Sequence, residues 1–193
     1  MKNVPRTLAI FLISITIISG GCIRNTSSAG GLEAAVNELG RDRYETPGDI
    51  LTPFLKQAEK ANKKLFLVFG WKGCSWCRRF EQYHEDSDVR EILDKYFIII
   101  NIDIKKSQAC EDLYKTYGNP GTPSWAILDP GRNVIADSDN LKDGTGNVGY
   151  PLKAEEVEYY KAALKTSRPL ITDLELTVLA EKLITYGTVK NEK

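Results

Sequence analysis

Two cysteines three residues apart, directly after an apolar segment, constrain this chain more than any other feature. Cys74 and Cys77 follow the run Leu65–Phe69, which is typical of a buried strand. Phe80 and Tyr83 continue after the cysteines at roughly helical spacing. The pattern therefore places Cys74 at the N-terminus of a helix and Cys77 one turn further along it.

This placement predicts reactive sulfur chemistry. The N–H groups of a first helical turn and the positive end of the helix dipole favour a thiolate over a thiol. Lys72, Arg78 and Arg79 add positive charge nearby, and such surroundings lower the pKa of a cysteine below its usual value of about 8.5. Two cysteines at this spacing can also form a disulfide with little backbone movement. We therefore expect Cys74 to be the attacking thiolate and Cys77 the resolving thiol.

A Cys-x-x-Cys pair also occurs in zinc sites, in c-type haem sites and in structural disulfides. A zinc site needs two further ligands, and the remaining candidates are Cys22, Cys110 and the single histidine, His84. Haem attachment needs a histidine directly after the second cysteine, where this chain has Arg78. A structural disulfide stays open as an alternative. The sequence favours a redox-active pair that uses no metal or other cofactor.

The composition agrees with one globular domain that carries extensions. The chain has 193 residues, of which 42% are hydrophobic and 27% are charged, enough for a sizeable core with a polar surface. The formal net charge is zero. Because nucleic-acid binding calls for a basic surface, this balance argues against a nucleic-acid partner.

The N-terminus has the pattern of an export signal over residues 1–21. A positive stretch precedes the apolar segment Leu8–Ile18, which is too short to span a bilayer. Small residues then lead to Cys22, and this arrangement resembles a bacterial lipoprotein signal. The resemblance implies lipidation of Cys22 and membrane attachment on the periplasmic or extracytoplasmic side. An ordinary cleaved signal and an uncleaved anchor are the alternatives. Residues 22–44 are expected to form a tether with a short helix.

The remaining pattern predicts an α/β fold, because apolar strands alternate with amphipathic helices and thereby imply a parallel sheet core. A turn signal before the last strand predicts that it pairs back as an antiparallel hairpin. We expect the folded domain over 45–166 and a C-terminal helical extension over 167–193. Strands are expected at 65–69, 96–102, 124–128 and 134–136, and helices at 49–62, 74–83, 88–95, 107–117, 155–164 and from Thr172 to just before Gly187.

Together these features resemble the thioredoxin-like superfamily over residues 45–140. The resemblance is carried by the strand at 65–69, by Cys74-Ser75-Trp76-Cys77, and by Gly121-Thr122-Pro123 before a strand. It implies a central mixed sheet flanked by helices, with an extra C-terminal helix in this chain. It also implies that Pro123 is a cis-proline opposite the cysteines. The backbone of Thr122 would then be exposed for pairing with a substrate strand.

Several further residues near the cysteine pair are assigned from the sequence. Trp71 and Trp76 are candidates for an apolar rim that faces the substrate, with packing of Trp71 on the helix as the alternative. His84 lies among acidic residues and is expected on the surface. Cys110 is expected to be a buried cysteine without a disulfide. Val68 stands where thioredoxins carry a buried aspartate that assists proton transfer.

These observations predict an exported, lipid-anchored thiol–disulfide oxidoreductase. Its substrates would be proteins with thiols or disulfides, and a redox partner would recycle the Cys74–Cys77 pair. One alternative is a thioredoxin-fold metallochaperone that holds copper(I) on the two thiolates. Another is a non-catalytic protein that binds clients through the groove at Thr122 and Pro123.

Overall fold

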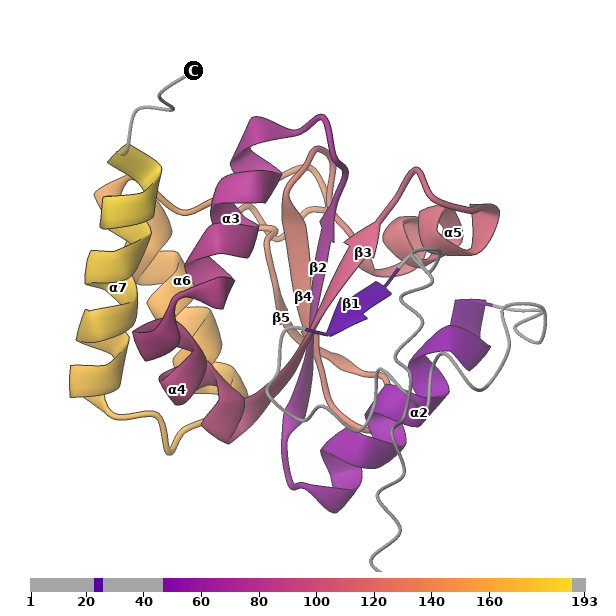
Figure 1. Ribbon diagram of the computed structural model, residues 1–193, viewed down its shortest axis with the longest axis horizontal. Coiled ribbons are helices and arrows are strands. Elements are labelled where there is room, and N and C mark those ends of the chain that lie inside the picture. Colours follow the sequence, from indigo (N-terminus) through magenta and orange to yellow (C-terminus); the bar gives the residue numbers. More distant parts are fainter. Residues whose placement is uncertain (1–22, 26–46, 189–193) are drawn as a thin grey trace, which may run out of the picture.

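A mixed sheet forms the centre of the molecule (Figure 1). The computed structural model describes residues 23–25 and 47–188. Within them the sheet has five strands in the order β1-β3-β2-β4-β5, with β2 and β3 parallel and the other neighbours antiparallel. The predicted mixed sheet is therefore confirmed. The strands are β1 (Ile23–Asn25), β2 (Lys64–Gly70), β3 (Phe97–Asp103), β4 (Ser124–Leu128) and β5 (Val134–Asp137).

Helices cover both faces of this sheet. Helices α3, α4, α6 and α7 lie on one side, and α2 and α5 lie on the other (Figure 1). None of the helices in the described part of the chain is both long enough and apolar enough to cross a membrane. The helices are α2 (Pro47–Lys60), α3 (Ser75–Glu85), α4 (Ser87–Tyr96), α5 (Gln108–Tyr117), α6 (Ala154–Ser167) and α7 (Asp173–Thr188).

The two faces of β2 pack into separate cores, which explains its uninterrupted apolar sequence. Successive side chains of a strand point to opposite faces of the sheet. Accordingly, Phe66 and Val68 join the core under α3, α4, α6 and α7. Leu65, Leu67 and Phe69 join the core under α2 and α5. Burial on both faces removes the polar alternation that marks a half-exposed strand.

Two segments differ from their predicted form. Arg24 and Asn25 were expected in the tether, but Ile23–Asn25 pairs with β3 as the edge strand β1. Pairing at a sheet edge uses backbone hydrogen bonds, so it needs no apolar signal in the sequence. Helix α7 also continues through Gly187 to Thr188 rather than ending before the glycine. The export signal, Cys22 and the predicted short helix lie outside the described residues.

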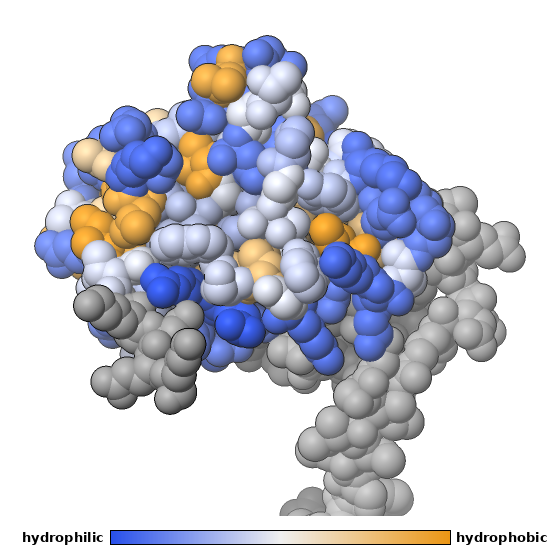
Figure 2. Space-filling view, turned by 90° about the horizontal axis from the view of Figure 1, so that it is seen from above, coloured by the Kyte–Doolittle hydropathy of each residue, from blue (hydrophilic) through white to orange (hydrophobic). Residues whose placement is uncertain are grey.

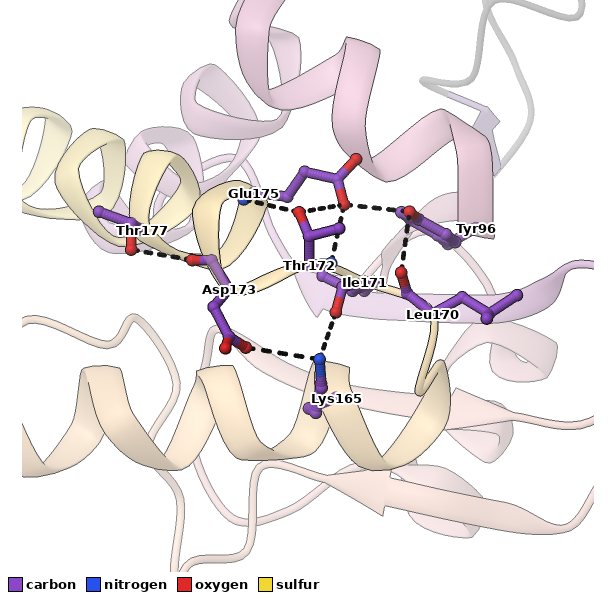
Figure 3. Close-up of polar contacts among 8 residues, drawn as sticks. All are labelled: Tyr96, Lys165, Leu170, Ile171, Thr172, Asp173, Glu175 and Thr177. Atoms are coloured by element: carbon purple, nitrogen blue, oxygen red, sulfur yellow. Dashed lines mark hydrogen bonds and ion pairs between the residues drawn. The ribbon is translucent and has the colours of Figure 1, made fainter.

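Helix α7 is fixed at both ends by polar contacts. At its start, Thr172 and Glu175 form a capping box: Glu175 N donates to the Thr172 hydroxyl, and a Glu175 carboxylate oxygen accepts from Thr172 N at 2.9 Å. The same carboxylate accepts a hydrogen bond from Tyr96 of α4 at 3.0 Å (Figure 3). Near its other end, Lys182 and Tyr186 each lie 3.0 Å from the Asp86 carboxylate. The extension is therefore joined to the α3–α4 layer.

Candidate functional site

The cysteine pair lies where β2 leads into α3. Cys74 is the N-cap of α3 with an extended backbone, and Cys77 lies in the first turn. A turn closed by the hydrogen bond from Cys74 N to Trp71 O brings the chain from the strand into the helix. The two sulfurs form a disulfide, and their Cα atoms lie 5.2 Å apart. The sequence therefore placed both cysteines at the correct positions of the correct helix.

The helix N-terminus directs its polar groups at Cys74. The N–H of Cys77 donates to Cys74 Sγ at 3.1 Å, so one N–H that has no partner within the helix is satisfied by the sulfur. In the reduced protein, the same N–H would point at the sulfur that carries the negative charge of a thiolate. Hydrogen bonds to a charged form favour that form. Cys74 is thus the better placed of the two sulfurs to react as an anion.

Gly70, the last residue of β2, packs directly against the side chain of Cys77. A Cβ atom at position 70 would lie 3.0 Å from Cys77 Cβ and 3.1 Å from Cys77 Sγ. These separations are shorter than ordinary carbon–carbon and carbon–sulfur contacts, so a glycine leaves the space that the second sulfur occupies. The close approach explains why the strand ends in glycine at this point.

The loop before β4 faces the disulfide, as expected from the resemblance. The Thr122–Pro123 peptide bond is cis. The carbonyl oxygen of Thr122 lies 3.5 Å from Cys74 Sγ, so the structure brings together two segments that are 48 residues apart. Gly121 precedes them with φ of 97°, a left-handed backbone conformation that favours glycine. The cysteines and this loop therefore form one site at the end of the sheet.

Asn147, from the loop between β5 and α6, holds the Pro123 loop in place. Its amide nitrogen donates to the carbonyl of Pro123 at 3.1 Å, and its amide oxygen accepts from Gly149 N at 2.9 Å. Gly149 has φ of 51°, and a Cβ there would lie 2.8 Å from the Pro123 carbonyl oxygen. The Asn-x-Gly spacing of the loop is the sequence signal that could have identified Asn147.

Asp139 organises that loop from within. One of its carboxylate oxygens accepts from the backbone nitrogens of Leu141 and Gly146, and the other accepts from that of Gly144. The carboxylate is therefore occupied by backbone donors. No group of three or more histidine, cysteine, aspartate or glutamate side chains suited to a metal ion occurs among residues 23–25 and 47–188.

The two tryptophans occupy different positions beside the cysteines. The Trp71 ring lies over Gly73, where an added Cβ would be only 1.9 Å from a ring atom. The ammonium of Lys105 lies 3.7 Å from the centroid of the same ring. Trp76 is 40% exposed and contacts the Tyr150 ring at a centroid distance of 5.4 Å. Trp71 thus packs against the turn, and Trp76 presents aromatic surface to the solvent.

An open pocket of about 640 Å³ lies beside the Pro123 loop, between the β3–α5 turn and α5. Its lining includes Lys105, Gln108 and Tyr114. The Tyr114 hydroxyl donates to Asn119 O at 2.8 Å and accepts from Gly121 N at 3.0 Å, so the pocket wall is joined to the loop. The site therefore borders a hollow as well as an exposed aromatic ring.

The prediction that His84 lies on the surface is wrong. Its side chain is fully buried, with its ring centroid 4.3 Å from that of Phe80 and 5.6 Å from that of Phe66. Neither ring nitrogen makes a hydrogen bond of ordinary geometry within the described residues, although a contact with the backbone of Phe80 opposes the effect of burial on the pKa. Burial disfavours the charged form and lowers the pKa of His84 to about 3. A neutral imidazole enclosed by aromatic rings does not fit an acid–base role at the cysteines.

The prediction for Cys110 is half correct. The residue is fully buried, as expected, and its sulfur lies 3.0 Å from the hydroxyl of Ser107, the N-cap of α5. However, Cys110 forms a disulfide, and the described residues contain no free cysteine. The chain therefore uses a third sulfur for bonding rather than only for packing.

The arrangement identifies the fold. A dicysteine at the start of the helix after β2 faces a cis-proline loop before β4, across a mixed sheet with helices on both sides. The chain has a thioredoxin-like fold. Consistent with it, the family model Thioredox_DsbH, described as a protein of unknown function (DUF255), matches residues 51–128. That range extends from α2 through β4 and contains both cysteines and the proline.

Curated relatives share part of this thioredoxin-like chain. It is 27% identical over 104 residues to the uncharacterized protein B0495.5 of Caenorhabditis elegans. It is 26% identical over 102 residues to spermatogenesis-associated protein 20 of Mus musculus. The alignments cover 50% and 49% of this chain but only 14% and 13% of those two proteins. The chain thus corresponds to a small part of each relative.

Two solved structures are also similar to the chain. One is a disulphide isomerase from Xylella fastidiosa Temecula1, with a TM-score of 0.43, 21% sequence identity, and coverage of 50% of this chain and 76% of that chain. The other is a thioredoxin-fold protein from Helicobacter pylori, with a TM-score of 0.39, 20% identity, and coverage of 65% of this chain and 84% of that chain.

Proposed function

We propose that the protein is a thiol–disulfide oxidoreductase that acts on protein disulfides or thiols outside the cytoplasm. One observation carries the proposal. Cys74 caps the N-terminus of α3, is bonded to Cys77 one turn along, and lies 3.5 Å from the carbonyl oxygen of Thr122. This geometry supplies an activated sulfur, a second sulfur within bonding distance and a backbone edge beside both.

The reaction follows from the two sulfurs. In the reduced protein, the Cys74 thiolate attacks one sulfur of a substrate disulfide, and the other substrate sulfur leaves as a thiolate that takes up a proton. Cys77 then loses its proton and attacks Cys74 Sγ, which releases the second substrate thiol. The substrate gains two electrons and two protons, and the protein ends as the Cys74–Cys77 disulfide. Run in reverse, the same steps oxidise a substrate dithiol.

The surroundings of the sulfurs are suited to an extended polypeptide. The backbone of Thr122, beside Cys74, can pair with a substrate strand as β-augmentation does. The exposed ring of Trp76 offers aromatic surface on the α3 side. Together with Trp71 and Pro123, these residues are the proposed substrate-binding set. No resident metal or cofactor enters the proposed steps.

Export rests on the N-terminal sequence. Residues 1–21 have the sequence pattern of a signal, followed by Cys22 as the proposed lipidation site and membrane anchor. Labelling of the protein with a radioactive fatty acid in growing cells, compared with a Cys22→Ala variant, tests the anchor.

Reduction of insulin by dithiothreitol tests the catalytic proposal. The wild type should accelerate the precipitation of the insulin B chain, and Cys74→Ser should abolish the acceleration because the attacking sulfur is lost. Cys77→Ser should instead accumulate a mixed disulfide with insulin, visible on a non-reducing gel. Turnover that survives in Cys74→Ser would refute the proposal. Absence of turnover together with tight copper(I) binding would support the metallochaperone alternative.

The direction of electron flow follows from one further measurement. Equilibration of the Cys74–Cys77 pair in glutathione buffers gives its reduction potential. A strongly reducing value would assign a reductase that needs a donor partner, and a strongly oxidising value would assign an oxidase that needs an acceptor.

A further inference from the structure

The segments around the disulfide carry an excess of positive charge that the whole chain does not have. The complete sequence has 26 basic and 26 acidic residues. Residues 70–80, which hold both cysteines, contain three cations and no carboxylate, and residues 103–108 contain two lysines and one aspartate. The segments 118–124 and 147–152 complete the site and are uncharged. The five cations are Lys72, Arg78, Arg79, Lys105 and Lys106.

The fold brings these two basic segments to the same end of the sheet. Gly70, at the end of β2, pairs with Asp103, at the end of β3, so the segments that follow both strands emerge side by side. The contact between Lys105 and the Trp71 ring joins them directly. Figure 2 looks down on this end, where β2 leads into α3, and shows residues of intermediate hydropathy bordered by blue, hydrophilic clusters.

Two of the cations are directed by aromatic rings. The Arg79 guanidinium lies 4.7 Å from the centroid of the Trp76 ring and also donates to the carbonyl of Gly187 in α7. Lys105 lies over Trp71. These contacts place positive charge beside the aromatic surface on both sides of the cysteines without neutralising it, because an aromatic ring carries no net charge.

Carboxylates within the described residues do not neutralise these cations. None of the five forms an ion pair with an aspartate or glutamate in that part of the chain, whereas Lys182 pairs with two aspartates and Lys115 contacts two acidic residues. Of the carboxylates near Lys105, Asp103 accepts from the backbone nitrogen of Lys105 at 3.1 Å, and Glu111, which lines the same pocket, pairs with Lys115. The positive charge of these cations is therefore available to interact with a bound partner.

We propose that the polypeptides that exchange disulfides with Cys74 carry acidic residues beside their reacting cysteine. This inference rests on the proposed oxidoreductase function and names its class of substrate. Complementary charge accelerates encounter and disfavours partners of the same sign. The cations lie beside the cysteines in and before α3 and at the β3–α5 turn, where Lys105 contacts Trp71. An acidic segment next to the reacting cysteine of a substrate would be attracted by both groups of cations.

A series of peptide disulfides of equal length tests the proposal. Each substrate is a symmetrical disulfide of a short peptide in which the residues flanking the cysteine are all glutamate, all serine or all lysine. Each turnover oxidises Cys74 and Cys77 to the disulfide and reduces one substrate molecule to two peptide thiols. Stopped-flow tryptophan fluorescence of the pre-reduced protein follows the rate, since Trp71 and Trp76 lie beside the sulfurs.

The expected order is glutamate, then serine, then lysine. The rate constants of the acidic and basic peptides should differ by at least about tenfold at low ionic strength. The difference should shrink strongly in 0.5 M salt, where the Debye length falls to about 4 Å. The double variant Lys72→Glu/Lys106→Glu should reverse the order. The matched control, Lys56→Glu/Lys60→Glu, changes net charge equally on exposed positions of α2 at the opposite end of β2 and should keep it.

The uncharged 2-hydroxyethyl disulfide distinguishes a failure of the oxidoreductase function from a failure of the preference for acidic substrates. If the wild type reduces neither this compound nor any peptide, the oxidoreductase function itself is wrong. If it reduces this compound but treats the three peptides alike, or prefers lysine, the oxidoreductase stands and the acidic partner is wrong. Binding of nucleic acid or of anionic vesicles that depends on Lys72 and Lys106, without an ordering of the peptides, would assign the charge to another polyanion and overturn the inference.

Discussion

His84 should make the stability of the protein depend on pH in a range where few other groups titrate. The imidazole is fully buried, makes no hydrogen bond of ordinary geometry within the described residues, and has a pKa lowered to about 3 by burial. In the unfolded chain its pKa returns to about 6.5. Between these values the unfolded state binds a proton that the folded state does not. Stability is therefore fully present above pH 6.5 and is lost as the pH falls.

The size of the effect follows from the two pKa values. At pH 5 the unfolded chain gains about 2 kcal/mol from protonation of this one residue, while folded His84 remains neutral. The His84→Leu variant fills a similar volume with a group that does not titrate. Relative to this variant, the wild type should lose about 2 kcal/mol between pH 8 and pH 5. At pH 8 the variant should be as stable as the wild type or more so, since it removes unpaired buried nitrogens.

Guanidinium unfolding of both proteins from pH 8 to pH 5 measures this difference. The comparison cancels the contribution of the carboxylates to the pH dependence of stability, because both proteins have the same carboxylates. Gln82→Leu, an exposed position on the same helix, is the matched control and should follow the wild-type profile. Because the chain has one histidine, a single imidazole signal in the NMR spectrum reports its charge directly. A signal that titrates near pH 6.5 in the folded protein, or a constant difference across the range, would refute the reasoning.

Three other substitutions test the site and its support. Asp86→Ala removes the N-cap of α4 and the carboxylate that binds α7. Partial burial would raise the pKa of this carboxylate, but hydrogen bonds, foremost that from Lys182, hold it below its usual value. The substitution should lower the free energy of unfolding by about 2–3 kcal/mol in guanidinium, and a loss under about 0.5 kcal/mol would contradict this role. Gly70→Ala forces a Cβ against Cys77 and should destabilise the oxidised protein by about 1–3 kcal/mol. Asn147→Ala releases the Pro123 carbonyl and should slow insulin reduction severalfold with little change in the reduction potential of the cysteine pair, whereas an unchanged rate would show that the loop holds its position without it.

The sequence was sufficient for the elements whose signals are local. Apolar runs identified β2 and β3, and Ser107 and the Thr172–Glu175 pair identified two helix starts through hydrogen bonds confined to one turn. The spacing of Cys74 and Cys77 determined that they could bond, because three residues across a first helical turn bring two sulfurs together in any context. The position of the Pro123 loop was available only through resemblance to a family.

Tertiary structure alone decided the environment of His84, the role of Asn147 and the state of Cys110. Acidic neighbours in the sequence suggested an exposed histidine, but successive residues of a helix point in different directions, and His84 lies on the face that packs against Phe66 of β2. Asn147 reaches a carbonyl 24 residues away in the chain. Local patterns report the period of an element and its ends. They do not report which distant segment closes over it, since that depends on how all the layers pack together.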